Sequence, residues 1–313
     1  MTEILWITPD KPENLSVGRR QIAKRLENRG YSITQVGNRK TALRKAAIAN
    51  YNILITTSAV GGIAGPIAKK RGKDYIVDYV DPILQLRHSG TLPMAHLGHY
   101  LQSVAFRACD RIIYTYAEET LRVSRFDKPT VKTTLGVDYD RFVTAEPTTD
   151  FDLPEVYAVY IGGLEDIYNI ETLLQSAIGN YNVVIAGDGK HRDLVEIKAQ
   201  EHAEITYLGL IDHSKVPQIL ADADVGVNLV DDPHTVKVLE YAAAGLPIVH
   251  AEGRAETVLP NSVRFTPIES ESVSQAVNHA MSDRTHPELQ QYAKQRDYEQ
   301  VADDYERIIE GEI

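Results

Sequence analysis

Short apolar runs alternate with amphipathic stretches along the first half of the chain. Runs typical of buried strands lie at residues 4–7, 31–36, 51–56, 75–80 and 111–115. Between them, apolar residues at helical spacing mark residues 19–29, 61–70 and 97–109. Strands that alternate with helices predict a parallel sheet covered by helices on both faces, which is a doubly wound α/β fold.

The same alternation begins again after residues 145–154, a polar segment with two prolines that we interpret as a linker. Strands are predicted at 156–161, 182–186, 205–208, 225–230 and 247–250, with helices at 170–177, 216–221 and 236–244. We therefore expect two Rossmann-like domains, residues 1–146 and 155–288, that face a ligand-binding cleft. A long amphipathic helix is expected over residues 289–309, and we expect residues 289–313 to pack back on the N-terminal domain.

Charge is distributed unevenly between the two halves. Residues 1–150 contain 22 Lys and Arg against 15 Asp and Glu, a net charge of +7, whereas the remainder carries −18. A basic N-terminal domain indicates an anionic partner, such as an anionic membrane surface or a phosphorylated acceptor. A solvated helix face is the alternative explanation. Nucleic acid is disfavoured because aromatic residues are not interleaved with the basic ones.

The ends and the cysteine content bear on the compartment. The N-terminus shows no signal-peptide pattern, and no run of about 18 apolar residues is present. The single cysteine, Cys109, excludes an intrachain disulfide framework. We expect a cytoplasmic protein, with peripheral attachment to the cytoplasmic membrane face as an open alternative.

The segment at residues 232–245 carries the strongest candidate chemistry. A loop follows a predicted strand, and either Asp232 or Thr235 is placed to cap the helix that comes next. A helix start that faces a cleft offers backbone amides and a positive dipole end to a diphosphate, and Lys237 adds charge in the first turn. Glu240, three positions later, lies on the same side of the helix and can accept bonds from a ribose diol.

Residues 232–249, DPHTVKVLEYAAAGLPIV, resemble the donor-site signature of retaining GT-B glycosyltransferases of family 4. Further blocks in the same order resemble other parts of that family. They are GVDYDRF at 136–142, IGGL at 161–164 with IETLL at 170–174, VIAGDG at 184–189, YLG at 207–209 and ADADV at 221–225. The resemblance implies a two-domain GT-B fold and a hexosyltransferase that uses a UDP- or GDP-sugar as substrate, without a permanently bound cofactor. The acceptor implied is a glycan or a lipid-linked molecule.

The resemblance also implies roles for individual residues. Glu240 would hold the nucleotide ribose, Asp232 would lie near the hydroxyls of the donor sugar, and Asp81 would lie on the acceptor side. The remaining implied donor contacts are the diphosphate-flanking residues Gly162, Gly163, Pro233, His234, Thr235 and Val236, the turn residues Gly187 and Gly189, the base contacts Leu210 and Ile211, and Gly18 on the N-terminal side.

Two departures from the family pattern leave alternatives open. The family usually has Glu at the position of Asp232, so Asp231 is a possible substitute. The family usually has Arg and Lys at the positions of Gly163 and Tyr168, where they neutralise the leaving phosphate. Here Lys237, Lys190 or Arg19 would have to supply that charge. A non-catalytic glycosyltransferase-like subunit and a sugar-nucleotide epimerase on the same scaffold remain alternatives.

Two other site types are disfavoured. A dinucleotide dehydrogenase is unlikely because the first strand is followed by TPDK rather than by a glycine-rich fingerprint. His96 and His99 have a helical spacing that suits a metal, but no third ligand is evident, so we expect no metal site. His88 and these two histidines are interpreted as surface or acceptor-loop residues.

Overall fold

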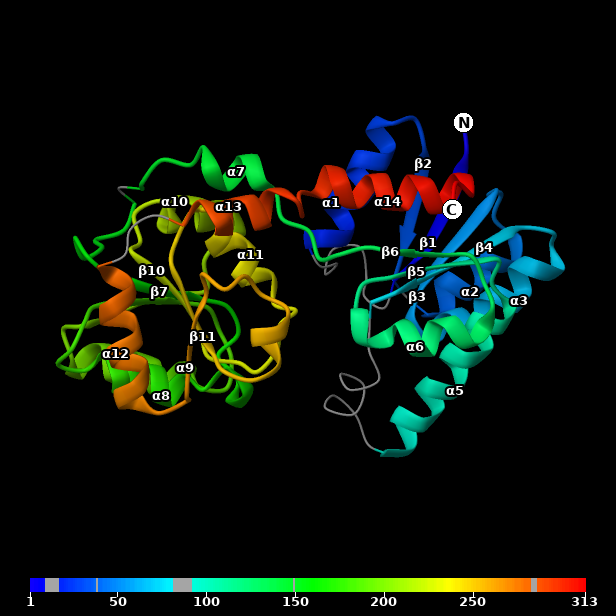
Figure 1. Ribbon diagram of the computed structural model, residues 1–313. Helices are drawn as coiled ribbons and strands as arrows, with labels where there is room; N and C mark the ends of the chain where they lie inside the picture. The colour runs from blue at the N-terminus through cyan, green and yellow to red at the C-terminus, as the bar shows by residue number, and fades with distance from the viewer. Residues whose placement is uncertain (9–16, 38, 81–91, 149, 283–285) are drawn as a thin grey trace. The chain divides into compact units, whose positions relative to one another are not determined.

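A computed structural model describes residues 1–8, 17–37, 39–80, 92–148, 150–282 and 286–313 (Figure 1). The chain divides into two compact units. Unit 1 comprises Met1–Gly136 with Tyr298–Ile313, and unit 2 comprises Val137–Asp297. Each unit is built on its own parallel sheet and is described by itself. Within the described residues, no helix is long and apolar enough to cross a membrane.

The sheet of unit 1 is parallel throughout, as predicted. Its strands follow the spatial order β2-β1-β3-β4-β5-β6. They are β1 (Glu3–Ile7), β2 (Ser32–Val36), β3 (Ile53–Thr57), β4 (Asp74–Tyr79), β5 (Arg111–Tyr114) and β6 (Thr130–Lys132). The last of these was not predicted, because three residues at a sheet edge show too little hydrophobic periodicity.

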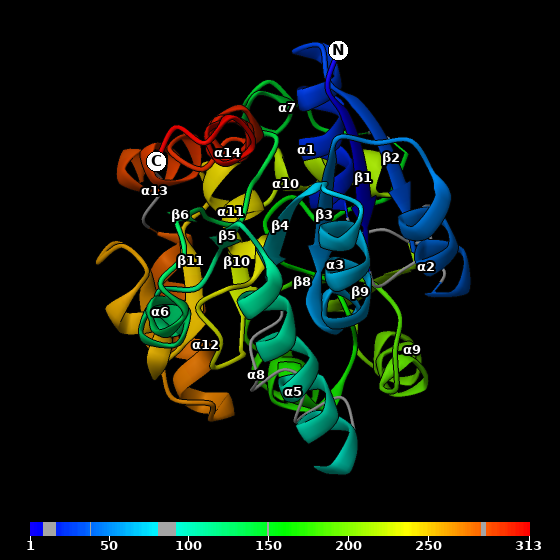
Figure 2. The same ribbon diagram turned by 90° about the vertical axis from the view of Figure 1, so that its right-hand side faces the viewer.

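Helices cover both faces of this sheet (Figures 1 and 2). Along β1, Ile4 and Trp6 point to a core shared with α1 and α14, while Leu5 and Ile7 point to the opposite core with α2, α3 and α5. This alternation is the period of two expected of a strand that is buried on both sides. The helices are α1 (Val17–Asn28), α2 (Arg39–Ile48), α3 (Gly61–Lys70), α5 (Leu92–Ala108), α6 (Thr120–Val123) and α14 (Tyr298–Glu310).

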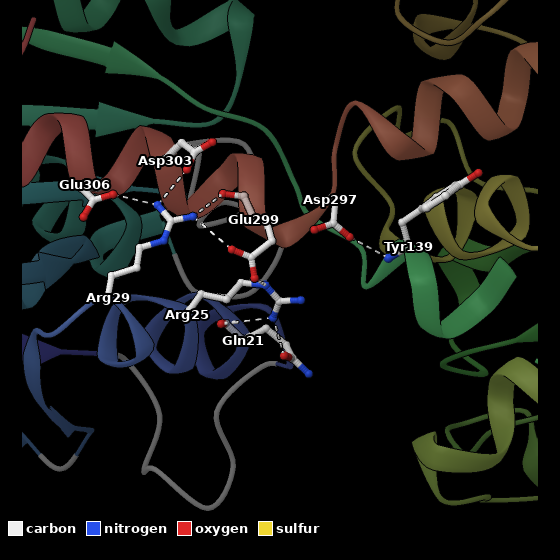
Figure 3. A network of polar contacts seen from close by, with 8 residues as sticks. All are labelled: Gln21, Arg25, Arg29, Tyr139, Asp297, Glu299, Asp303 and Glu306. Carbon is white, nitrogen blue, oxygen red and sulfur yellow. Dashed lines mark hydrogen bonds and ion pairs between the residues drawn. The ribbon is translucent and has the colours of Figure 1, made fainter. Parts of the chain in front are cut away.

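The terminal helix α14 is joined to α1 by ion pairs as well as by apolar packing. The guanidinium of Arg29 lies 3.0 Å from Glu299, 2.7 Å from Asp303 and 2.8 Å from Glu306 (Figure 3). Arg25 pairs with the same Glu299 at 2.9 Å. Part of the basic character of the N-terminal sequence is therefore matched by an acidic helix from the other end of the chain.

Unit 2 has a second parallel sheet in the spatial order β12-β11-β10-β7-β8-β9. The strands are β7 (Ala158–Ile161), β8 (Val183–Ala186), β9 (Ile205–Gly209), β10 (Val225–Asn228), β11 (Ile248–Ala251) and β12 (Arg264–Thr266). The helices are α7 (Tyr139–Val143), α8 (Ile170–Ala177), α9 (Arg192–Glu201), α10 (Val216–Leu220), α11 (Val236–Ala243), α12 (Ser270–Met281) and α13 (Pro287–Lys294). The two sheets confirm the predicted fold class, a pair of doubly wound α/β units.

Helix α11 is fixed to its sheet by one tyrosine. The hydroxyl of Tyr241 accepts a hydrogen bond of 3.1 Å from the backbone N–H of Ile161, at the end of β7. The ring lies against Gly226 of β10, where any Cβ would overlap it. Small and large residues in adjacent elements thus set the distance between α11 and the carboxyl edge of the sheet.

The prediction of one helix over residues 289–309 is wrong. The chain forms α13 and α14 with a break between them, and α13 belongs to unit 2 while α14 belongs to unit 1. At the break, Asp297 accepts a hydrogen bond of 2.9 Å from the N–H of Tyr139 (Figure 3). The N–H of Val137 donates to the carbonyl of Arg296. The carbonyl of Arg296 thus has a partner in place of the amide that a continued helix would supply, and the first amide of α7 is bonded to the carboxylate of Asp297.

The chain also passes between the units at different places from those expected. It leaves unit 1 after Gly136 and returns after Asp297. Residues 137–146 and 289–297, which were expected to belong to the N-terminal domain, are part of unit 2, and so is the polar segment 145–154. Composition placed the linker at the prolines, whereas the packing of α7 against α10 and α11 decides the boundary.

Candidate functional site

The loops after β7 and β8 meet at the carboxyl edge of the sheet of unit 2. The N–H of Gly162 donates to the carbonyl of Ala186 at 3.0 Å, and the N–H of Leu164 donates to that of Asp188 at 2.9 Å. Gly187 has a φ of +149°, and a Cβ there would overlap the carbonyl oxygen of Gly162. The two loops can approach this closely only because glycine has no side chain.

Gly189 serves the same packing. Its φ is +153°, and a Cβ would lie 2.8 Å from both the backbone nitrogen of Leu164 and the carboxylate of Glu165. The glycine-rich turn at the end of β8 therefore supports the loop after β7. This gives Gly187 and Gly189 a structural role that the sequence interpretation did not separate from donor contact.

The loop that leads into α11 is ordered by its own polar side chains. Asp232 accepts a hydrogen bond of 2.9 Å from the N–H of His234, and the hydroxyl of Thr235 accepts one of 3.0 Å from the side chain of Asn228. Thr235 occupies the N-cap position of α11, but no side chain caps the helix. The prediction that Asp232 or Thr235 caps it is thus wrong. Both oxygens are used within the loop, and the N–H of Val238 donates to the carbonyl of Thr235 at 3.2 Å, so the amides of Val236 and Lys237 are those left to water or a ligand.

The side chain of Asp231 is bonded to Arg254, in the turn after β11. Its carboxylate accepts a hydrogen bond of 2.8 Å from the N–H of Arg254, and its backbone carbonyl accepts one from the guanidinium of the same residue. A Cβ on Gly253 would come within 2.7 Å of that carboxylate. Asp231 therefore holds the turn after β11, which leaves Asp232 as the acid of this loop that is half-buried beside α11.

Lys237 lies in the first turn of α11 with only 9% of its surface exposed. Its ammonium donates to the hydroxyl of Tyr160 at 3.0 Å, and that hydroxyl in turn donates to the carbonyl of Gly163 at 2.5 Å. The ammonium also lies 4.2 Å from the ring centroid of Tyr160 and 4.1 Å from that of Tyr168, distances typical of cation–π contacts. A Cβ on Gly162 would meet it at 2.9 Å.

Burial changes the protonation of this lysine. Desolvation lowers the pKa of Lys237 to about 7, and the negative charge of nearby Glu240 opposes that shift. The aromatic rings supply partial compensation but no counter-charge. The site therefore places a cation at the end of β7 that an incoming anion would stabilise.

Glu240 lies one turn further along α11, and its side chain is 11% exposed. Its Oε1 atom is 2.8 Å from Nε2 of His213, the first residue of a short 3₁₀ turn after β9. Nδ1 of His213 lies 3.2 Å from the guanidinium of Arg141 in α7, and that guanidinium also donates to the His213 carbonyl. The carboxylate of Glu240 thus has one oxygen bonded to His213 and lies near the buried ammonium of Lys237.

The acidic loop between β7 and α8 is partly neutralised by its neighbours. Asp166 pairs with Lys190 at 2.6 Å and with His191 at 2.7 Å, and these hydrogen bonds lower the pKa of Asp166. Lys190 is therefore engaged with that loop. Of the two proposed cations that lie in unit 2, Lys237 is the one whose ammonium contacts Tyr160 at the end of β7.

The remaining predicted residues are placed as follows. Leu210 and Ile211 follow β9 in unit 2, and Leu210 is 79% exposed. Gly18 and Arg19 lie in α1 of unit 1, where a Cβ on Gly18 would be 3.3 Å from the hydroxyl of Tyr298. Asp81 and His88 lie outside the described residues.

Arg19 is paired inside unit 1. Its guanidinium lies 3.6 Å from the carboxylate of Asp78, which is fully buried at the end of β4. Asp78 also accepts hydrogen bonds from Tyr305 at 2.9 Å and Thr57 at 3.2 Å. Burial raises the pKa of Asp78, against the opposing effect of Arg19 and these two donors.

The sequence interpretation did not single out four residues that complete the site of unit 2. Tyr160 and Tyr168 enclose the ammonium, His213 bonds to Glu240, and Arg141 holds His213. Tyr168 had a signal, since it stands where the resembled family has a cation. Arg141 lies inside the quoted block at 136–142, but nothing local to the sequence links it to Glu240, which is 99 positions away.

Residues 157–283 match the model of the family described as Glycosyl transferases group 1. Solved structures similar to the whole chain include sucrose-phosphate synthase from Thermosynechococcus elongatus, with a TM-score of 0.76, 16% identity and 99% of each chain covered. HepE from Anabaena, solved in complex with UDP-glucose, has a TM-score of 0.73 at 15% identity and covers 99% of this chain and 100% of its own. OtsA has a TM-score of 0.71 at 12% identity, with 98% of each chain covered. A search of curated proteins found no significant match.

The two units and their parallel sheets are those of the GT-B fold. Residues 157–283, which include α11 and its loop, thus match a group 1 glycosyltransferase domain, and they lie within a chain of GT-B fold.

Proposed function

We propose that this enzyme transfers a sugar from a nucleotide-sugar donor, a UDP- or GDP-sugar, to a glycan or lipid-linked acceptor with retention of configuration. The observation that carries the proposal is the position of Lys237. Its buried ammonium lies beneath Gly162, where it can bind a diphosphate. The carboxylate of Glu240, one turn later in the same helix, can bind a ribose. The structure of HepE with UDP-glucose supports this class of donor.

Lys237 acts on the leaving group in this proposal. When the bond between the sugar and the diphosphate breaks, the electron pair stays on the phosphate oxygen, and a positive group fixed nearby lowers the barrier. The amides of Val236 and Lys237 at the start of α11 add donors and a favourable dipole for the same anion. Lys237 thus takes the place of the Arg and Lys that the resembled family carries in the loop after β7.

The acids and the loops hold the rest of the donor. Glu240 accepts hydrogen bonds from the two ribose hydroxyls. Asp232, kept in place by its bond to the His234 amide, accepts a hydrogen bond from a hydroxyl of the sugar. Other proposed donor contacts are the backbone of the loop after β7 and of the loop before α11, with the segment after β9 near the base. The proposed contributors from unit 1 are Gly18 and Arg19 towards the donor and Asp81 towards the acceptor.

Calorimetry with the full chain tests the donor site. We expect UDP or GDP, and the matching nucleotide sugar, to bind the wild type, and we expect Lys237→Ala and Glu240→Ala each to weaken binding at least tenfold. Lys198→Ala is a matched control, because Lys198 pairs with Glu201 on the surface of α9 in the same unit. If no nucleoside diphosphate binds the wild type, the proposed donor is wrong.

Retention is tested on the product. The anomeric proton coupling of the transferred sugar, followed by NMR during the reaction, should match that of the donor. An inverted product would contradict the proposal. Donor binding without any transfer to a panel of glycan and lipid-linked acceptors would instead favour a non-catalytic subunit, and conversion of the donor sugar without an acceptor would favour an epimerase.

Exposed basic residues of unit 1, on helices at both faces of its sheet, are the basis for proposing a peripheral location on an anionic membrane. Arg20 and Lys24 in α1 and Arg44 in α2 are exposed, whereas Arg25 and Arg29 are neutralised by α14. Exposed basic residues attract anionic lipid by about 1 kcal/mol each at low ionic strength. Co-sedimentation should therefore show more binding to vesicles with phosphatidylglycerol than to phosphatidylcholine vesicles, and equal binding to both would contradict this location.

A further inference from the structure

The imidazole of His213 bridges two charged side chains in unit 2. Its Nε2 lies 2.8 Å from Oε1 of Glu240, and its Nδ1 lies 3.2 Å from a terminal nitrogen of Arg141. The other terminal nitrogen of Arg141 donates to the backbone carbonyl of His213. One chain of contacts thus runs from α7 through the 3₁₀ turn to the carboxylate in α11.

The arginine decides which ring nitrogen carries the proton. A guanidinium has only N–H donors, so the nitrogen that faces it must be an acceptor with a free lone pair. Nδ1 is therefore unprotonated, and the proton of the neutral ring is on Nε2, directed at Glu240. The carboxylate is therefore held by the Nε2–H group of His213. Arg141 fixes the orientation of His213 through two contacts, one to the ring and one to the backbone carbonyl.

We propose that His213 and Arg141 are positioning residues for the nucleotide ribose, acting through Glu240. This inference rests on the proposed function, in which Glu240 accepts the two vicinal hydroxyls. Each oxygen of an ionised carboxylate can accept two hydrogen bonds, so Oε1 can keep the bond to His213 and still accept a hydroxyl. With one oxygen held, the carboxylate does not have to lose rotational freedom when the ribose binds.

The inference makes a prediction that a merely structural role would not. The recognition of the ribose diol, and not the overall affinity alone, should depend on His213. A wild-type preference for a ribonucleoside diphosphate over its 2′-deoxy analogue of about tenfold is expected, since a hydrogen bond to a charged acceptor has about that worth. Loss of the positioning donor should reduce that preference.

The test is calorimetry of the full chain with UDP and GDP and with their 2′-deoxy analogues. His213→Ala and Arg141→Ala should lower the ribose preference to within about twofold of unity. His213→Gln should restore most of it, because the glutamine amide nitrogen reaches about as far as Nε2 and donates in the same direction. His202→Ala is the matched control, a half-buried histidine of the same unit that is paired at the surface with Glu201.

The outcomes separate this inference from the function on which it rests. Absence of binding by the wild type overturns the donor proposal and this inference with it. If the wild type binds with a ribose preference that Glu240→Ala abolishes, Glu240 has its proposed role. If His213→Ala then keeps the wild-type preference, or if His213→Gln loses as much of it as His213→Ala, the positioning role is wrong.

Discussion

The ammonium of Lys237 lies 3.0 Å from the hydroxyl of Tyr160 and 4.1 Å from the ring centroid of Tyr168. Tyr168 stands at a position where the resembled family carries a cation, and here its ring instead faces a cation that comes from α11. A cation from the helix after β10 thus lies against the loop after β7.

Replacement of Lys237 should separate stability from donor binding. Lys237→Met removes a poorly solvated ammonium while keeping the apolar stem, so the free energy of unfolding should rise on the order of 2 kcal/mol near neutral pH. Affinity for nucleoside diphosphate should fall at least tenfold. Chemical denaturation and calorimetry measure the two effects, and Lys198→Met is expected to change neither. Loss of stability without loss of binding would contradict the proposed role.

The lowered pKa of Lys237 predicts two opposite pH dependences. Burial brings it from 10.5 to about 7, so between those values the unfolded chain binds the extra proton and the folded chain does not. Stability of the wild type relative to Lys237→Met should therefore rise with pH across this window. Diphosphate binding requires the ammonium, so affinity should fall above about pH 7 with proton uptake on binding.

Calorimetry in buffers of different ionisation enthalpy measures that proton uptake directly. Lys237→Met should show none at any pH between 7 and 9. An affinity of the wild type that does not change over this range would mean that the ammonium is charged before the ligand arrives, and would contradict a pKa of about 7.

The sequence was sufficient for the fold class, and it supplied the central residues of the candidate site as a prediction. Continuous apolar runs such as that of β7 can only be buried strands when they alternate with amphipathic helices, and Lys237 and Glu240 were identified from their spacing in one helix. Tyr160 and His213 were not, because they are 77 and 27 positions away from the side chains that they contact. Contacts of this kind follow from the register of a sheet and not from any local pattern.

The break between α13 and α14 shows the same limit. Apolar residues continue at helical spacing through residues 289–309, so the local pattern favours one helix. The interruption depends on Asp297, which bonds to the amide of Tyr139, 158 positions earlier. Local periodicity reports which face of a segment is buried, but a partner from elsewhere in the chain decides where the helix ends.

Because the two glycine-rich loops approach closely, we expect a methyl group added at Gly187 to destabilise the fold. Gly187→Ala would place a Cβ against the carbonyl oxygen of Gly162 and should lower the free energy of unfolding by about 3 kcal/mol. Gly179→Ala is the control, because its φ of +73° carries the strain of a left-handed residue, about 1 kcal/mol, with no atom within 4 Å of the new Cβ. Denaturant titrations measure both. Equal costs would mean that the loops can separate without penalty, and Gly187 would lose its packing role.

The buried acid of unit 1 is bonded to the terminal helix. The hydroxyl of Tyr305 in α14 donates to the fully buried carboxylate of Asp78 at 2.9 Å. Tyr305→Phe leaves the ring in place but removes one donor from a buried acceptor, so we expect a loss of about 2 kcal/mol in the free energy of unfolding. Tyr31→Phe removes a hydroxyl that bonds to the exposed Glu310 of the same helix, and should cost less than about 0.5 kcal/mol.

The stability deficit of Tyr305→Phe should also depend on pH. Burial raises the pKa of Asp78, and loss of a donor should raise it further. The deficit should therefore shrink as the pH falls and the carboxyl becomes protonated in the folded chain. A deficit that stays constant from pH 7 to pH 4 would show that the hydroxyl does not stabilise the ionised form of Asp78.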